Sequence, residues 1–196
     1  RLAKQGLRKG FSCLFYGAPG TGKTESVLQI AKQTGRNIMQ VDIANMKSCW
    51  VGESEKMIKK LFVNYRNIVR KSEVAPILLF NEADALFGTR MENTQHAVDK
   101  MENTIQNIIL QEMEDLEGIL IATTNLTKNL DKAFERRFIY KIEFAKPDIR
   151  TSKKIWHSML PELKPAELDI VARKYLFSGG QIENVTRKKA INYILN

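Results

Sequence analysis

Gly17-Ala18-Pro19-Gly20-Thr21-Gly22-Lys23-Thr24 is the stretch that decides the fold of this chain. It fits the pattern G-x-x-x-x-G-K-[ST], and it comes directly after an apolar run that ends at Tyr16 and directly before a stretch of helical periodicity. Glycines let the backbone wrap closely round phosphate groups, with its N–H groups pointing inward, and the following helix adds its positive end. The sequence therefore predicts a phosphate-binding loop.

The side chains of this loop have separate expected roles. Lys23 is expected to neutralise the outer phosphates of a nucleotide, and Thr24 to place its hydroxyl on a Mg²⁺ ion that bridges the β- and γ-phosphates. The expected cofactors are therefore ATP and Mg²⁺. The residues expected to bind the nucleotide are Gly17, Pro19, Gly20, Thr21, Gly22, Lys23 and Thr24.

Apolar runs bounded by turn residues recur along the chain, and stretches of helical periodicity separate the first four of them. Each helical stretch is long enough for a right-handed crossover that joins parallel strands. The chain is therefore predicted to be an α/β protein with a doubly wound, five-stranded parallel sheet. The strands are expected at residues 11–16, 38–41, 77–80, 119–122 and 139–144, and the helices at 24–34, 54–71 and 98–113.

After Lys146-Pro147 the strand signals stop, and only helical stretches follow. We therefore expect two domains, a P-loop nucleotide-binding domain over residues 1–146 and a small helical lid over residues 147–196. The lid helices are expected at 149–159, 165–174 and 180–195.

A second polar motif, Asn81 and Glu82, follows the buried strand expected at 77–80, where ligand-binding groups of open α/β sheets lie. P-loop nucleotide hydrolases generally carry an Asp at the first position to hold the magnesium shell, and many add a Glu that polarises the attacking water. Glu82 is the expected general base. Asn81 keeps an oxygen for the magnesium shell without the charge, so we expect nucleotide binding to survive better than the hydrolysis rate.

Three explanations of Asn81 stay open: natural variation with activity retained, a natural switch that hydrolyses poorly, or an engineered change that traps nucleotide. The first is favoured because Glu82 and the other catalytic elements are present.

The remaining motifs resemble the AAA family, the ATPase core within the AAA+ superfamily, along nearly the whole chain. Trp50-Val51-Gly52-Glu53-Ser54-Glu55-Lys56 is very similar to the first pore loop of the katanin, spastin and fidgetin group, which grips a translocating polypeptide. This resemblance implies that Trp50 and Val51 contact a protein substrate. From residue type alone, Trp50 packing in the core is an equal alternative.

Three further segments resemble functional motifs of the family. Residues 122–125 are similar to the first sensor, which implies that Asn125 holds the water and the γ-phosphate; a turn cap is the alternative. Residues 130–138 resemble the arginine-finger segment, which implies that Arg136 and Arg137 reach the γ-phosphate bound by a neighbouring subunit; a surface pair is the alternative. Residues 177–182 resemble the lid motif that approaches the adenine, which implies a nucleotide contact at Gly180, and Arg187 is a weaker candidate for a lid arginine.

The composition permits several partners. The chain has 31 Lys and Arg against 22 Asp and Glu, a net charge of +9, which can attract nucleic acid, acidic proteins or phosphates. No aromatic residues lie between the basic clusters in the way that stacks bases, so solvated helix faces are the favoured explanation of these clusters.

No apolar run approaches the roughly 18 residues of a membrane span, and two cysteines are too few for a disulfide framework. We expect a cytoplasmic protein without membrane contact and, because it begins at Arg1, part of a longer chain.

Together these features predict an ATP-driven motor that hydrolyses ATP to ADP and phosphate, assembles into a ring, a hexamer in full-length form, and remodels or threads a protein substrate. Two alternatives stay open. One is a loader associated with nucleic acid, which the charge permits and Trp50-Val51-Gly52 argues against. The other is a nucleotide-gated scaffold with weak hydrolysis, which Asn81 suggests.

Overall fold

The computed structural model describes residues 10–41, 53–87, 97–127 and 130–195 of the chain. These residues form two compact units. The first contains the residues up to Tyr16 and those from Thr24 to Glu143, and the second contains residues 17–23 and those from Phe144 onward. The domain boundary expected after residue 146 stays a prediction.

The first unit is built on a five-stranded parallel sheet with the strand order β2-β3-β4-β1-β5. This confirms the α/β class and the five parallel strands that the sequence predicts. Strand β4 runs two residues beyond its apolar run, because Thr123 and Thr124 continue the pairing with Phe15 and Tyr16 of β1. The strands are β1 (Phe11–Tyr16), β2 (Ile38–Val41), β3 (Ile77–Phe80), β4 (Ile119–Thr124) and β5 (Tyr140–Glu143).

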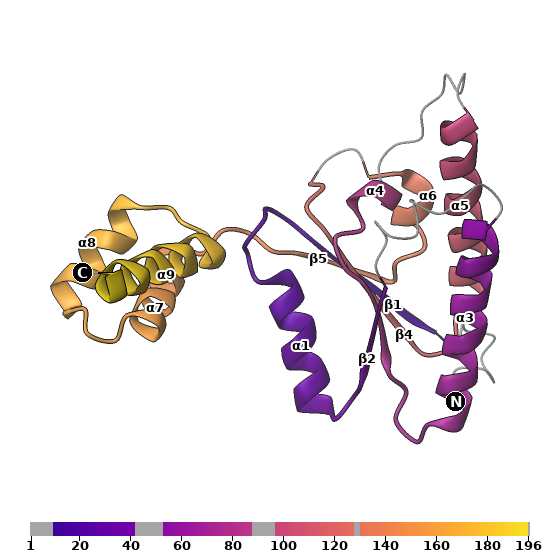
Figure 1. Ribbon diagram of the computed structural model, residues 1–196, viewed down its shortest axis with the longest axis horizontal. Coiled ribbons are helices and arrows are strands. Elements are labelled where there is room, and N and C mark those ends of the chain that lie inside the picture. The colour runs from indigo at the N-terminus through magenta and orange to yellow at the C-terminus, as the bar shows by residue number, and fades with distance from the viewer. Residues whose placement is uncertain (1–9, 42–52, 88–96, 128–129, 196) are drawn as a thin grey trace. The chain divides into compact units, whose positions relative to one another are not determined.

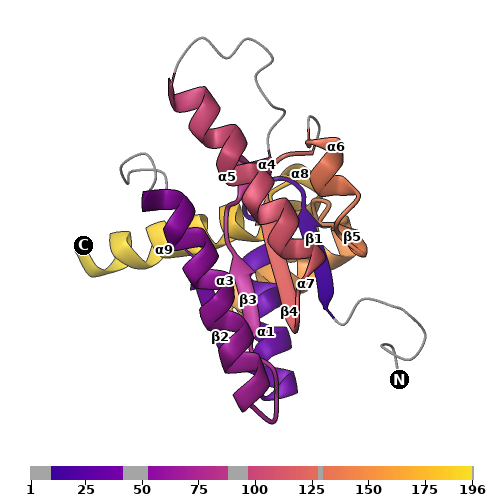
Figure 2. The same ribbon diagram turned by 90° about the vertical axis from the view of Figure 1, so that its right-hand side faces the viewer.

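The order in which the chain visits the strands decides which face each helix covers. The connection from β1 to β2 crosses the sheet in one direction, and those from β2 to β3 and from β3 to β4 run back in the other. Because such crossovers are right-handed, the helix of the first connection and the helices of the other two lie on opposite faces. Figures 1 and 2 show α1 (Lys23–Thr34) on one face, and α3 (Glu53–Lys71) and α5 (Ala97–Glu114) on the other.

Two short helices were not predicted from the sequence. Helix α4 (Asp84–Phe87) follows β3, and α6 (Lys132–Glu135) precedes β5. Four residues are too few to show a helical period. Helix α6 begins because the carboxylate of Asp131 accepts a hydrogen bond of 2.7 Å from the backbone N–H of Ala133.

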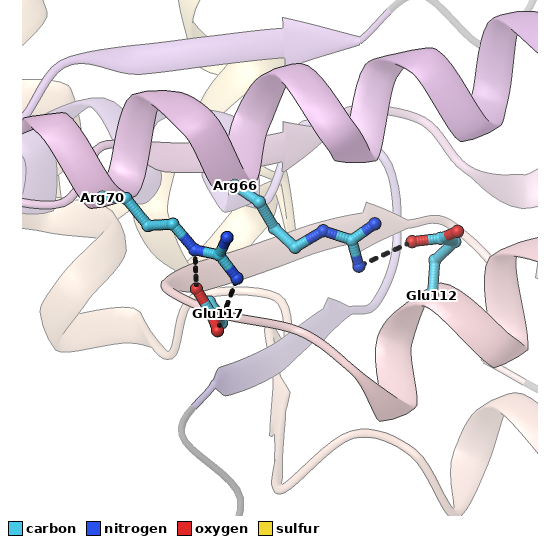
Figure 3. Close-up of polar contacts among 4 residues, drawn as sticks. All are labelled: Arg66, Arg70, Glu112 and Glu117. Atoms are coloured by element: carbon cyan, nitrogen blue, oxygen red, sulfur yellow. Dashed lines mark hydrogen bonds and ion pairs between the residues drawn. The ribbon is translucent and has the colours of Figure 1, made fainter.

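Helix α3 is held on the sheet by both apolar and charged side chains. Phe62 and Tyr65 are buried to 1% and 0% exposure. In Figure 3, Arg66 points toward Glu112 of α5, with 3.1 Å from Nη1 to Oε2, and Arg70 donates hydrogen bonds of 2.8 and 3.1 Å to Glu117, just before β4. These ion pairs join α3 to α5 and to the residue just before β4.

The second unit contains the helices α7 (Ile149–Met159), α8 (Pro165–Lys174) and α9 (Gly179–Leu195). They pack round a small core of their own, formed by Trp156, Leu160, Ala172 and Ile182. The helical C-terminal region is therefore confirmed, and its helices begin and end within one residue of the predicted bounds. In the part of the chain that the structure describes, no helix has the length and apolar character needed to cross a membrane.

Candidate nucleotide site

The phosphate loop has a backbone that only glycine adopts easily. Gly20 and Gly22 have φ angles of 72° and 92°, in the left-handed region. A Cβ on Gly20 would also lie 2.8 Å from Ser178 Oγ, whereas a Cβ on Gly22 would meet no atom within 4 Å. The backbone conformation therefore requires both glycines, and close packing adds a second requirement at Gly20.

Lys23 closes the loop from inside. Its side chain is 7% exposed, and its Nζ donates hydrogen bonds of 2.8 Å to the carbonyl of Gly17 and 2.9 Å to that of Ala18. Thr21 Oγ1 donates a further bond of 2.8 Å to the carbonyl of Ala18. A buried ammonium beside the first turn of α1 provides positive charge where a phosphate would bind, so the loop fits such a group.

The start of α9 lies against the same loop. The backbone N–H of Gly180 donates a 2.9 Å hydrogen bond to the carbonyl of Gly20, and a Cβ on Gly180 would lie 3.0 Å from Gly20 Cα. Beside this contact lies a pocket of about 550 Å³, in the size range of small-ligand sites. It is lined by Ala18, Pro19, Gly20, Lys146, Ser178, Gly180, Gln181, Glu183, Asn184 and Arg187. The structure thus brings Gly180 and Arg187 to the phosphate loop.

A second group of polar side chains lies in the sheet unit, where β3 and β4 end. Asn81 Oδ1 accepts hydrogen bonds of 2.7 Å from Thr24 Oγ1 and 2.9 Å from Thr123 Oγ1. This donor set of hydroxyl and amide oxygens suits Mg²⁺, which prefers oxygen ligands and keeps several waters. Among the described residues, no cluster of three or more His, Cys, Asp or Glu forms another metal site. Thr24 and Asn81 therefore fit the proposed ion.

Glu82 has an unusual backbone conformation. Its φ is 52°, the single positive φ among the described residues that are not glycine, and its side chain is exposed. Its backbone N–H donates a 3.0 Å hydrogen bond to Thr123 Oγ1. A left-handed conformation is costly for a residue with a side chain and is often found at functional sites. Glu82 is thus the residue at which the chain turns sharply after β3.

Asp84 is a residue of this group for which the sequence predicted no role. Its Oδ1 accepts hydrogen bonds of 2.5 Å from Thr124 Oγ1 and 2.7 Å from the backbone N–H of Asn125, and its Oδ2 accepts one of 3.2 Å from Asn125 Nδ2. Asp84 therefore fixes the side chain of Asn125 beside the end of β3. A second acidic residue two positions after Glu82 was the signal that could have found it.

The two arginines after α6 have different surroundings. Arg136 caps the C-terminus of α6 with its backbone, and its side chain is exposed. The guanidinium of Arg137 forms an ion pair with Glu114 at the end of α5 and is 28% exposed. The structure thus holds Arg137 against its own chain. Trp50 and Val51, expected to contact a substrate, lie outside the described residues.

The phosphate loop that follows β1 and the polar group at the ends of β3 and β4 define this chain as a P-loop protein of the α/β class. The chain belongs to the AAA family, because the model of the "ATPase family associated with various cellular activities (AAA)" matches residues 13–146.

Three relatives illustrate this membership. The meiotic spindle formation protein mei-1 of Caenorhabditis elegans is 34% identical over 97% of this chain and 41% of its own length. Cell division protein C of Sulfolobus acidocaldarius is 32% identical over 80% of this chain and 42% of its own. The katanin p60 ATPase-containing subunit A1 of Arabidopsis thaliana is 29% identical over 96% of this chain and 38% of its own. The resemblance to the AAA family is confirmed, and the chain spans less than half the length of these relatives.

Proposed function

We propose that this chain is the ATP-hydrolysing core of an AAA protein, which converts ATP and water into ADP and phosphate. The observation that carries the proposal is the geometry round two consecutive residues, Lys23 and Thr24. The ammonium of Lys23 lies inside the phosphate loop, and the hydroxyl of Thr24 bonds to Asn81 at the end of β3. The first residue suits the phosphates of the nucleotide, and the second suits the magnesium ion that accompanies it.

The roles of the chain's residues follow from their positions. The loop N–H groups and Lys23 bind the β- and γ-phosphates, and the pocket beside Gly180 accepts the nucleoside. Mg²⁺, when held by Thr24 and Asn81, neutralises charge on the phosphate oxygens. Glu82 accepts the proton of the attacking water, and Asn125, fixed by Asp84, orients that water.

The same proposal covers assembly and substrate. Arg136 and Arg137 complete the site of a neighbouring subunit in a ring, a hexamer in the full-length protein, and Trp50 and Val51 grip a protein that the ring remodels. Membership of the AAA family supports ATP-driven remodelling of proteins in general. We further propose a division into domains after residue 146, a cytoplasmic location, and no membrane partner.

Asn81 favours a second candidate, a scaffold that binds ATP and scarcely hydrolyses it. An amide in place of a carboxylate removes one negative charge beside the magnesium site. ATP binding and steady-state hydrolysis, measured over a wide range of chain concentrations, separate the two candidates. The motor predicts binding that Lys23→Ala abolishes and a specific activity that rises with concentration. If the chain binds ATP but does not hydrolyse it at any concentration, the motor is excluded and the scaffold remains.

The kind of substrate is tested separately. An unfolded protein is expected to stimulate hydrolysis, and Trp50→Ala is expected to remove the stimulation while ATP binding stays the same. Stimulation by DNA alone, with no effect of Trp50→Ala, would favour a nucleic-acid-associated loader.

A further inference from the structure

The hydroxyl of Thr123 joins the two residues that follow β3. Thr123 is 1% exposed, near the carboxyl end of β4. Its Oγ1 accepts a 3.0 Å hydrogen bond from the backbone N–H of Glu82 and donates one of 2.9 Å to Asn81 Oδ1. One buried hydroxyl therefore contacts both the proposed general base and the proposed magnesium residue.

This arrangement favours one orientation of the Asn81 amide. A hydroxyl has a single proton and two lone pairs. Thr123 Oγ1 accepts the N–H of Glu82 with one lone pair and directs its proton at Oδ1 of Asn81. The amide oxygen accepts this proton, and the same oxygen also accepts the 2.7 Å bond from Thr24 Oγ1. With its proton donated to Asn81, the oxygen of Thr24 keeps its lone pairs for a cation.

An Asp at position 81 would not need this help. The two oxygens of a carboxylate are equivalent, so either one accepts a proton from Thr24. An amide has one oxygen and one NH₂ group, and the wrong orientation would present N–H donors to Thr24. The hydroxyl of Thr123 is thus useful to an Asn at this position in a way that it would not be to an Asp.

The same hydroxyl also acts on Glu82. With φ at 52°, Glu82 has a backbone conformation that a residue with a side chain adopts at a cost. The hydrogen bond from its N–H to Thr123 Oγ1 favours that conformation.

We propose that Thr123 is a positioning residue that allows an Asn at position 81 to serve the magnesium site. It holds the amide oxygen of Asn81 toward Thr24, and it stabilises the backbone turn at Glu82. This inference rests on the proposed function, since it concerns the residues toward which Mg²⁺ and ATP bind.

The experiment measures the affinity of the 196-residue chain for a fluorescent ATP analogue over a Mg²⁺ titration and in EDTA. Thr123→Val removes the hydroxyl and keeps the branched shape, and Thr123→Ser keeps the hydroxyl as the matched control. Both changes are made with Asn81 in place and together with Asn81→Asp. Thermal unfolding is measured for each variant, and Thr123→Ala replaces Thr123→Val if the latter does not fold.

With Asn81 in place, Thr123→Val is expected to raise the Mg²⁺ concentration at half-maximal binding by roughly three- to tenfold, the value of one net hydrogen bond. In EDTA, the affinity of Thr123→Val for the analogue stays within about twofold of that of the unmodified chain, and Thr123→Ser behaves like the unmodified chain under both conditions. Together with Asn81→Asp, the Mg²⁺ shift caused by Thr123→Val falls below about twofold. The rate of ATP hydrolysis is still lower for Thr123→Val combined with Asn81→Asp than for Asn81→Asp alone, because the contact with Glu82 is lost in both backgrounds.

Other results overturn the inference. If Thr123→Val lowers the affinity for the analogue equally in Mg²⁺ and in EDTA, the role of Thr123 is merely structural. If the Mg²⁺ shift is equal with and without Asn81→Asp, the amide of Asn81 does not need Thr123 for its orientation. No shift at all would remove the role of Thr123 while leaving the proposed function intact. Failure of the unmodified chain to bind the analogue would instead overturn the proposed function, and this inference with it.

Discussion

Single hydroxyl groups join strands of the sheet at both of its ends. At the carboxyl end, Thr123 contacts the residues after β3. At the amino end, Tyr65 of α3 is fully buried, and its hydroxyl oxygen lies 2.8 Å from the carbonyls of Pro76 and Ile119 and accepts a 2.7 Å bond from the N–H of Ile119. Because buried backbone groups need partners, this hydroxyl stabilises the starts of β3 and β4.

Replacing Tyr65 by Phe is therefore expected to destabilise the fold. The change leaves the N–H of Ile119 without this acceptor, which costs about 1–3 kcal/mol of the free energy of unfolding. Urea unfolding followed by circular dichroism measures the loss, and Tyr193→Phe, at a side chain 87% exposed, is the control without effect.

The effect of Tyr65→Phe also depends on pH. Burial raises the pKa of Tyr65 above its ordinary value of 10.0. The unfolded chain then releases the phenolic proton at a lower pH than the folded chain, so the stability from this group is complete below about pH 10 and is lost as pH rises through the raised pKa. The difference between the unmodified chain and Tyr65→Phe should shrink above pH 10; a constant difference would contradict the assignment.

At this scale the sequence predicted residue types better than contacts. The phosphate loop could be found because its residues are consecutive and its pattern is specific. The bonds from Thr123 and Thr124 to Asn81, Glu82 and Asp84 join positions about 40 residues apart, and only the register of β3 beside β4 brings them together. Glycines and lysines of a motif can be recognised in a single sequence, whereas a hydroxyl shared by two strands cannot.

Among the elements, the start of α9 packs closely against the phosphate loop. A Cβ on Gly180 would lie 3.0 Å from Gly20 Cα, which is backbone and cannot move aside alone. A Cβ on Gly179 would lie 3.5 Å from the carbonyl oxygen of Gly20, an ordinary contact. The two neighbouring glycines therefore offer a matched pair of substitutions.

Gly180→Ala is expected to weaken ATP binding by roughly tenfold, because the added methyl group displaces the backbone of the loop. Gly179→Ala should leave the affinity nearly unchanged, and both changes add a better helix former to α9. Isothermal titration with ATP and Mg²⁺ measures the difference. Equal affinities of the two variants would show that the loop does not depend on this contact.

The elements themselves were largely predictable, because the strands and long helices have enough residues to show a clear hydrophobic pattern. Strands β1, β2 and β3 and helices α7 and α8 have the predicted bounds. Helices α1, α3 and α9 begin one residue early, and α5 and β5 differ by one residue at each end. The failures have physical reasons. Thr123 and Thr124 are polar residues buried in β4, and α4 and α6 are single turns whose formation depends on local hydrogen bonds such as the cap at Asp131.

At the scale of the whole molecule, the two arginines after α6 bear on assembly. Arg136 is exposed, whereas Arg137 pairs with Glu114 of its own chain. We expect Arg137→Ala to lower the free energy of unfolding by about 0.5 kcal/mol, since the ion pair is partly exposed, and Arg136→Ala to leave it unchanged. Chemical denaturation of the two variants compares them directly, and equal stabilities would mean that the pair with Glu114 contributes nothing to the fold.

The proposed ring can be tested by mixing two inactive chains. Arg136→Ala keeps its own loop and Glu82 but cannot supply this arginine to a neighbour, and Glu82→Gln keeps the arginine but lacks the base. Arginine fingers are worth about 10³- to 10⁵-fold in rate, so each chain alone should hydrolyse ATP very slowly. In an equimolar mixture, roughly a quarter of the interfaces in a ring would join an intact Glu82 to an intact Arg136.

The expected result is recovery of activity on mixing. The double variant Glu82→Gln/Arg136→Ala is the control, and mixing it with either single variant should restore none. A mixture no more active than its parts would place Arg136 outside the neighbour's site, because sites completed in trans must reappear when the missing groups come from different chains.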